Sequence, residues 1–97
     1  MTYYTLIKEI IRIEQAGDFK RPLRPIEKRL ESLDDTIEVE TQLLGKAESI
    51  DEIRGRLTNT GTAVLNSLAR CGDFKKAREY ADTKYKPLED NYFPKAA

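Results

Sequence analysis

The chain has 97 residues, and its 17 Lys and Arg residues are balanced by 17 Asp and Glu residues, so the formal net charge is zero. A chain of this length supports one hydrophobic core, and we expect residues 1–97 to form a single helical domain. A zero net charge by itself favours no class of partner. Only the distribution of charge along the chain can therefore indicate a partner.

The chain contains no histidine and a single cysteine, Cys71. Without histidine, the Ser–His and Cys–His catalytic arrangements and histidine metal sites are excluded, and we predict a protein that is not an enzyme and uses no cofactor. One cysteine cannot form an internal disulfide, and no signal-peptide pattern is present, which together predict a cytoplasmic protein. Lys8, Glu9 and Arg12 interrupt the first apolar run, so we expect no membrane association.

The first predicted helix covers about residues 2–16 and has a wide apolar surface. Its apolar residues fall on two adjacent stripes, Tyr3, Leu6, Ile10 and Ile13 on one and Tyr4, Ile7 and Ile11 on the other. Together these stripes cover about half of the helix circumference, more than the ~100° that an ordinary surface helix buries. We therefore expect Tyr3, Tyr4, Ile7 and Ile11 to contribute to an interface with a second copy or with another protein.

The tetrapeptide Gly-Asp-Phe-Lys occurs twice, at residues 17–20 and 72–75, each time where an apolar helical pattern ends. Glycine at a helix C-terminus adopts a left-handed conformation at little cost, and Asp is a strong N-cap. We interpret both copies as elbows in which Gly ends one helix and Asp begins the next. The chain is then built from two helix–elbow–helix units in tandem.

Three further helices are predicted, over about residues 25–44, 50–71 and 74–86, with a tail over 88–97. Pro25 suits a first helical position, and Ser49 followed by Glu52 matches a capping box. The third helix has its apolar stripe at Ile50, Ile53, Leu57, Val64, Leu68 and Cys71. Pro87 is expected to end the fourth helix, because proline lacks the N–H that a helix interior needs. The sequence thus predicts an all-α, four-helix up-down bundle.

Two local patterns refine this prediction. Leu65-x-x-Leu68, followed by Gly72-Asp73-Phe74-x-x-Ala77, resembles the middle of a tetratricopeptide helical hairpin, which implies that the third and fourth helices pack against each other. The segment Thr58–Thr62 combines β-branched residues with Asn and Gly and is poor helix. Its small residues indicate a kink or close helix packing, with the approach of a ligand to the backbone as the alternative.

Charge is distributed unevenly once the helices are folded up and down, because both elbows then lie at the same end. We call the cations expected there the basic pole: Lys20, Arg21, Arg24, Lys28, Lys75, Lys76 and Arg78. Acidic residues gather at the other end, and we call them the acidic pole: Glu40, Glu48, Asp51 and Glu52. A basic pole of this kind can bind phosphate groups, an acidic protein, or the acidic pole of a second copy, and the ordinary alternative is a solvated surface without a partner.

Carboxylates and C-terminal aromatic residues complete the candidate features. Asp34 with Glu38, and Glu48 with Glu52, are four residues apart, but the Glu-x-x-His pairs of a di-metal bundle are absent, so we predict solvated acidic faces and no metal site. Large rigid aromatic side chains dominate many interfaces. We therefore include Tyr92 and Phe93 as interface candidates, with packing against the core as the ordinary alternative.

These observations favour a small helical protein that binds another protein or itself, as a small subunit or an inhibitor of a larger complex. The predicted surfaces are the wide apolar face of the first helix, the C-terminal aromatic residues and the basic pole. One alternative is a small subunit of a nucleoprotein complex that binds the nucleic-acid backbone through the basic pole. The other is a binder of a small anionic ligand near Thr58–Thr62 and Arg54 or Arg56.

Overall fold

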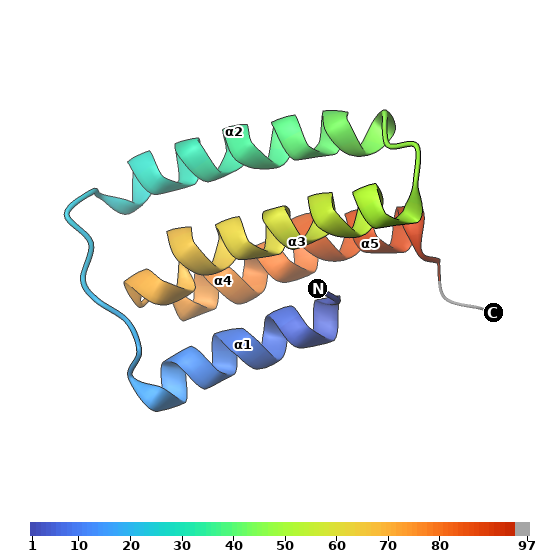
Figure 1. Cartoon of the computed structure of the whole chain (residues 1–97). Coiled ribbons are helices and arrows are strands. Elements are labelled where there is room, and N and C mark those ends of the chain that lie inside the picture. The colour runs from blue at the N-terminus through green and yellow to red at the C-terminus, as the bar shows by residue number, and fades with distance from the viewer. Residues whose placement is uncertain (95–97) are drawn as a thin grey trace.

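The computed structural model describes residues 1–94 and shows an all-α protein (Figure 1). Its elements are α1 (Tyr3–Ala16), α2 (Ile26–Gly45), α3 (Ile50–Ser67), a 3-10 turn (Ala69–Cys71), α4 (Phe74–Tyr80), a π-helical turn (Ala81–Tyr85) and α5 (Lys86–Tyr92). Because α4, the π-helical turn and α5 follow one another without a break, they form the fourth rod of a four-helix bundle. The predicted fold class is confirmed.

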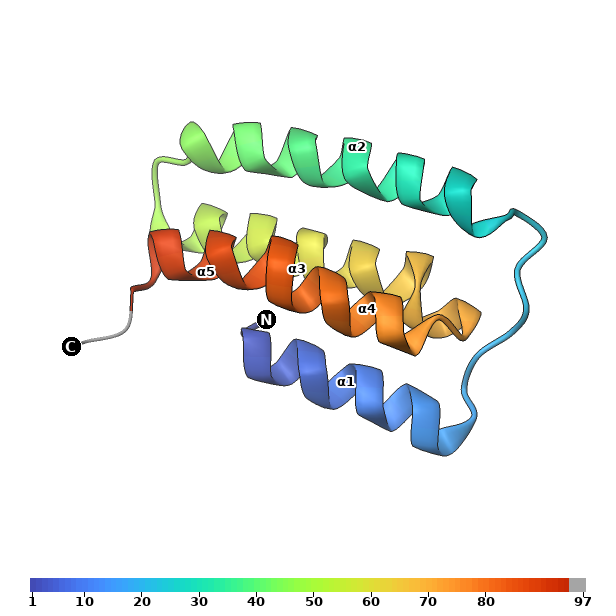
Figure 2. The ribbon, with the colours of Figure 1, turned by 180° about the vertical axis from the view of Figure 1, so that it is seen from behind.

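The four rods alternate in direction, but α1 and α2 are not neighbours. Both views place α1 and α2 on opposite sides of the pair formed by α3 and the α4–α5 rod (Figures 1 and 2). The segment 17–25 crosses one end of the bundle to connect them. As a result α2 packs mainly on α3, whereas α1 contacts both α3 and the fourth rod.

The core is formed by one apolar stripe from each rod. Its buried members are Leu6, Ile10 and Ile13 of α1; Leu33, Ile37 and Leu44 of α2; Leu57, Val64 and Leu65 of α3; and Leu68, Ala69, Ala77, Tyr80, Ala81 and Tyr85 from the rest of the chain. Glu40 lies in the seam between α2 and α3, where its carboxylate is 3.6 Å from Arg56. One residue of the predicted acidic pole is therefore buried.

Glycine and serine end and begin helices where the sequence predicted. Gly17 has a φ of 67° and Gly72 has a φ of 87°, the left-handed conformation that closes α1 and the turn after α3. The Ser49 hydroxyl accepts a hydrogen bond from the Glu52 N–H at 3.1 Å and so caps α3. These local signals depend only on neighbouring residues, which explains why the sequence alone revealed them.

The prediction of an N-cap is wrong for Asp18, and for Asp73 it holds for the position but not for the side-chain hydrogen bond. Asp18 precedes a loop, because α2 begins only at Ile26. Asp73 stands at the start of α4, but its side chain makes no capping hydrogen bond and is held instead by Arg29, with 2.7 Å between Nη1 and Oδ2. A charged partner from another helix outcompetes the local cap, since hydrogen bonds between charged groups are the stronger ones.

The fourth rod does not end before Pro87, and the predicted tail is partly helical. A proline inside an α-helix collides with the carbonyl four residues earlier, here Thr83, and cannot donate to it. The π-helical turn widens the rod just before this point, with the Lys86 N–H bonded to the Ala81 carbonyl, and Pro87 falls in the first turn of α5. The helix therefore continues to Tyr92, while residues 95–97 of the predicted tail lie outside the described residues.

The poor-helix segment 58–62 lies inside a continuous α3. Gly61 is buried, and a Cβ built there would be 2.3 Å from the Met1 sulfur and 3.5 Å from the Tyr85 ring. The small residue is thus explained by close packing, which was the favoured prediction. Two other details of α3 differ: the helix ends at Ser67 and tightens into the 3-10 turn, and Ile50 is exposed outside its apolar stripe.

Over residues 1–94, no helix combines the length and apolar character that crossing a membrane requires.

Candidate interaction surface at the basic pole

The two Gly-Asp-Phe-Lys elbows meet at one end of the bundle. The rings of Phe19 and Phe74 pack edge to face, with centroids 4.9 Å apart and planes at 83°. The Lys20 N–H donates to the Arg70 carbonyl at 3.0 Å. The repeated sequence therefore forms a contact between its own two copies, and this contact brings the cations of both elbows to one surface.

The crossing segment 17–25 presents an aliphatic side chain to solvent at this surface. Leu23 has a relative exposure of 105%, and Phe19 of 41%. Pro22 and Pro25 restrict the backbone on either side of Leu23, because proline fixes its own φ and disfavours the helical region for the residue before it. An exposed Leu in a restrained loop has no role in the core of this chain.

Arg29 fixes the far end of this loop. Its guanidinium donates to the Arg24 carbonyl at 3.2 Å, to the Ser67 carbonyl at 2.7 Å and to the Asp73 carboxylate at 2.7 Å. Only 10% of the Arg29 side chain is exposed. The loop is thus tied at Lys20 before Leu23 and at Arg24 after it. Sequence reasoning missed this role because the bonds join residues far apart in the chain.

A second group of charges joins α1 to the elbow after α3. Arg12 donates to Glu9 at 2.6 Å, and Arg70 lies 3.5 Å from the Asp18 carboxylate and 3.8 Å from that of Glu9. The hydrogen bond from Arg12, aided by the positive charge of Arg70, lowers the pKa of Glu9. These surface pairs orient the start of segment 17–25 and leave no strong charge unbalanced there.

The cations of the predicted basic pole differ in how far they are paired. Lys28 lies 3.8 Å from Glu31, Lys76 lies 3.3 Å from Glu79, and Arg78 lies 3.4 Å from Glu14. Arg24 donates to the Ser32 hydroxyl at 3.1 Å. Among residues 1–94, the side chains of Lys20, Arg21 and Lys75 have neither an ion pair nor a hydrogen bond, and all three are exposed.

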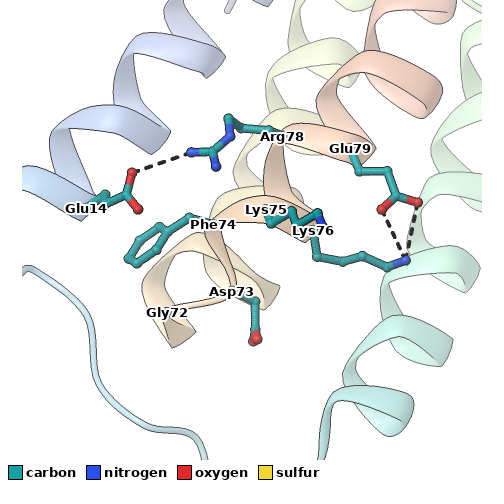
Figure 3. Close-up of a pocket in the computed structure, with 8 residues that line it drawn as sticks. All are labelled: Glu14, Gly72, Asp73, Phe74, Lys75, Lys76, Arg78 and Glu79. Carbon is teal, nitrogen blue, oxygen red and sulfur yellow. Dashed lines mark hydrogen bonds and ion pairs between the residues drawn. The ribbon is translucent and has the colours of Figure 1, made fainter.

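The balance of charge at this end is positive. Residues 17–29 and 70–78 contain nine Lys and Arg residues against three Asp and Glu residues, and the paired Glu14, Glu31 and Glu79 reduce the net charge from +6 to +3. The surface is hollowed on either side of the second elbow. One hollow lies beside Phe74 between the Glu14–Arg78 and Lys76–Glu79 pairs (Figure 3), and the other lies between Arg21, Arg24 and Gly72.

The predicted apolar face of α1 is only partly covered by the rest of the chain. Tyr4 is 67% exposed and Ile11 38%, whereas Ile7 is half-buried. Tyr3 is held by its own chain, because its hydroxyl donates to Asp82, and this hydrogen bond raises the pKa of Tyr3. The structure therefore separates Tyr3 from the exposed stripe with which it was grouped.

The C-terminal aromatic residues Tyr92 and Phe93 are half-buried against the core. The Arg54 guanidinium lies over the Phe93 ring, 5.8 Å from its centroid. Both aromatic side chains thus contact the chain itself, as the core-packing alternative holds. Within residues 1–94, no group of three or more Cys, Asp and Glu side chains is placed to hold a metal ion.

Comparison with known proteins returns no match to a family model, to a curated protein or to a solved structure.

Proposed function

We propose that this protein acts by binding, as a small subunit or an inhibitor, and that it docks its basic pole on an acidic surface of a partner protein. The observation that carries the proposal is Leu23, a fully exposed aliphatic side chain between Arg21 and Arg24 at the positively charged end of the bundle. A partner that buries Leu23 in an apolar pocket with an acidic rim would use both the side chain and its charged neighbours.

The same cations could hold phosphate groups, and the two partner classes differ in what they offer Leu23. A phosphate backbone attracts Lys and Arg but presents no apolar pocket to an aliphatic side chain. Single-stranded nucleic acid is bound by aromatic platforms, and here Phe19 and Phe74 pack edge to face against each other, with 4.9 Å between their ring centroids. The exposed Leu23 therefore favours a protein partner.

The loop that carries Leu23 is held in one conformation before any partner binds. Pro22 and Pro25 limit its backbone, and the hydrogen bonds from Lys20 to Arg70 and from Arg29 to Arg24 hold its ends. A preorganised loop loses little conformational freedom on binding, so more of the contact energy contributes to affinity. We place the protein in the cytoplasm, where the single thiol of Cys71 stays reduced.

Binding to two defined probes tests the proposal. The first is an acidic peptide in which Glu alternates with Leu, and the second is a DNA duplex of equal net charge, each followed by fluorescence anisotropy. We expect the peptide to bind more tightly than the duplex. Leu23→Ser should weaken peptide binding by roughly 10- to 150-fold and leave duplex binding unchanged, since burying one Leu contributes about 1.5–3 kcal/mol. Val39→Ser, at a site 53% exposed on α2, is the matched control.

Two results would overturn this assignment. Tighter binding of the duplex, steeply dependent on salt and insensitive to Leu23→Ser, would identify a phosphate backbone as the partner. Equal effects of Leu23→Ser and Val39→Ser on the peptide would show that Leu23 has no special role.

A further inference from the structure

The exposed part of the acidic pole mirrors the chemistry of the basic pole. Ile50, the first residue of α3, is 58% exposed, although its spacing predicts a place on the buried stripe. Its neighbours Glu48, Asp51 and Glu52 are all exposed. An aliphatic side chain amid carboxylates therefore stands at this end, where the basic pole has Leu23 between two arginines.

The two surfaces lie at opposite ends of the same molecule. Segment 17–25 precedes α2 and the turn 46–49 follows it, so the length of α2 separates them, and both views show them at the two ends of the bundle (Figures 1 and 2). The molecule measures 38 Å along its longest axis. One copy thus cannot bring its own poles together, but two copies placed end to end can.

We propose that the occupant of the basic pole is the acidic pole of a second copy of this chain. In this arrangement Leu23 of one copy packs against Ile50 of the next, and Arg21 and Arg24 face Glu48 and Asp51. The inference rests on the proposed function, since it requires that the basic pole bind an acidic protein surface. Charge complementarity and the matched exposed aliphatic residues are the observations that select a second copy.

Such a contact joins two different surfaces, so each added copy leaves one free basic pole and one free acidic pole. Head-to-tail contacts of this kind form rings or open chains and do not stop at a symmetric dimer. The two shorter axes of the molecule measure 26 Å and 19 Å, which bounds the area of an end face. A face of that size offers roughly 400–500 Å² per copy, below the ~800 Å² of a standard stable interface, so the association is weak and rises with concentration.

Sedimentation velocity on the parent chain and on two blocked variants tests the inference. Leu23→Ser with Arg21→Ser blocks the basic pole, and Ile50→Lys with Glu48→Lys blocks the acidic pole, so the two blocked poles do not carry opposite new charges. All four substituted residues are exposed, so the variants should keep the fold, which circular dichroism checks. We expect the parent to form growing oligomers at low salt and monomers at high salt. Each variant alone should be monomeric.

The decisive sample is the equimolar mixture of the two variants. It retains one intact acidic pole and one intact basic pole on different molecules, so it should form a dimer that does not grow. A parent that stays monomeric at the highest soluble concentration would overturn the inference. Dimers of either blocked variant alone would also overturn it and would point to another surface, such as the exposed stripe of α1, which Tyr4→Lys would then disrupt.

Failure of this inference is distinguishable from failure of the proposed function. A monomeric parent that still binds the acidic Glu–Leu peptide through Leu23 would retain the proposed function and exclude a second copy as the occupant. Loss of both self-association and peptide binding in the parent would remove both proposals together.

Discussion

Alanine at Gly72 should destabilise the protein more than alanine at Gly17, and the difference should depend on Phe19. Both glycines have a left-handed backbone, with φ of 87° and 67°. Alanine in that conformation costs about 1–2 kcal/mol, of which ~0.4–1 kcal/mol is offset by the lower entropy of the unfolded chain. The two sites share this cost. They differ in their surroundings. A Cβ at Gly72 would be 3.2 Å from the Phe19 ring, whereas a Cβ at Gly17 would have no atom within 4 Å apart from those of the adjacent residues.

The size of the extra destabilisation at Gly72 depends on the aromatic contact that Phe19 loses. Phe19 is 41% exposed and can move away from a new methyl group, but it then loses its edge-to-face contact with Phe74. Such a pair contributes about 0.5–1.5 kcal/mol beyond area burial. We therefore expect Gly17→Ala to cost about 0.5–1 kcal/mol and Gly72→Ala about 1–2.5 kcal/mol of the free energy of unfolding.

Urea unfolding followed by circular dichroism measures both values, and the same substitutions in a Phe19→Ala background provide the control. Removing the Phe19 ring should bring the two glycine variants to about the same cost, since both the crowding and the aromatic contact are then absent. An equal cost in the parent background would refute the reasoning. A difference that persists without Phe19 would refute it as well.

Three further outcomes are expected. Burial, with the hydrogen bond to Asp34, raises the pKa of Tyr80 from 10.0 to about 12. The contribution of neutral Tyr80 to the free energy of unfolding is therefore complete below pH 10 and is lost as the pH rises toward 12. In urea titrations, Tyr80→Phe should reduce the loss of unfolding free energy over that interval. A double-mutant cycle of Arg29→Met and Asp73→Asn should give a coupling of about 1–2 kcal/mol, below the value for a buried pair because Asp73 is partly exposed, and additive effects would contradict the contact. Leu23→Ala should change stability by less than about 0.5 kcal/mol in thermal melts, and a larger loss would show that Leu23 packs within its own chain.

Local sequence signals predicted the helices well because they act over a few residues. Gly17, Gly72 and Ser49 close or open helices through their own backbone or side chain, and each was identified correctly. The prediction that Pro87 ends the helix was wrong because the rule for proline assumes a regular α-helix. The wider π-helical turn before Pro87 removes the steric clash on which that rule depends. The sequence pattern of that segment gives no separate sign of a π-helical turn.

Pairings between distant residues were beyond sequence reasoning. Asp is a residue type that favours the N-cap position, and only the folded chain shows that the Asp73 carboxylate pairs with Arg29. The up-down order of the helices correctly placed the two elbows at one end, but it did not indicate that α1 and α2 lie apart. Ile50 matches the helical spacing of its neighbours and is nevertheless exposed, as the first residue of α3.

The attachment of α2 through a single main seam links local opening to binding. This helix packs mainly on α3, and two hydrogen bonds, from Arg29 to Asp73 and from Tyr80 to Asp34, connect it to the fourth rod, whereas α1, α3 and the fourth rod pack on one another. Detachment of α2 therefore requires less free energy than global unfolding. Leu23 lies in the segment that leads directly into α2, so detachment displaces Leu23 and its neighbouring arginines, whereas Ile50 stays on α3. A ligand held at Leu23 then protects the amide hydrogens of the whole of α2 from exchange, including those far from the contact.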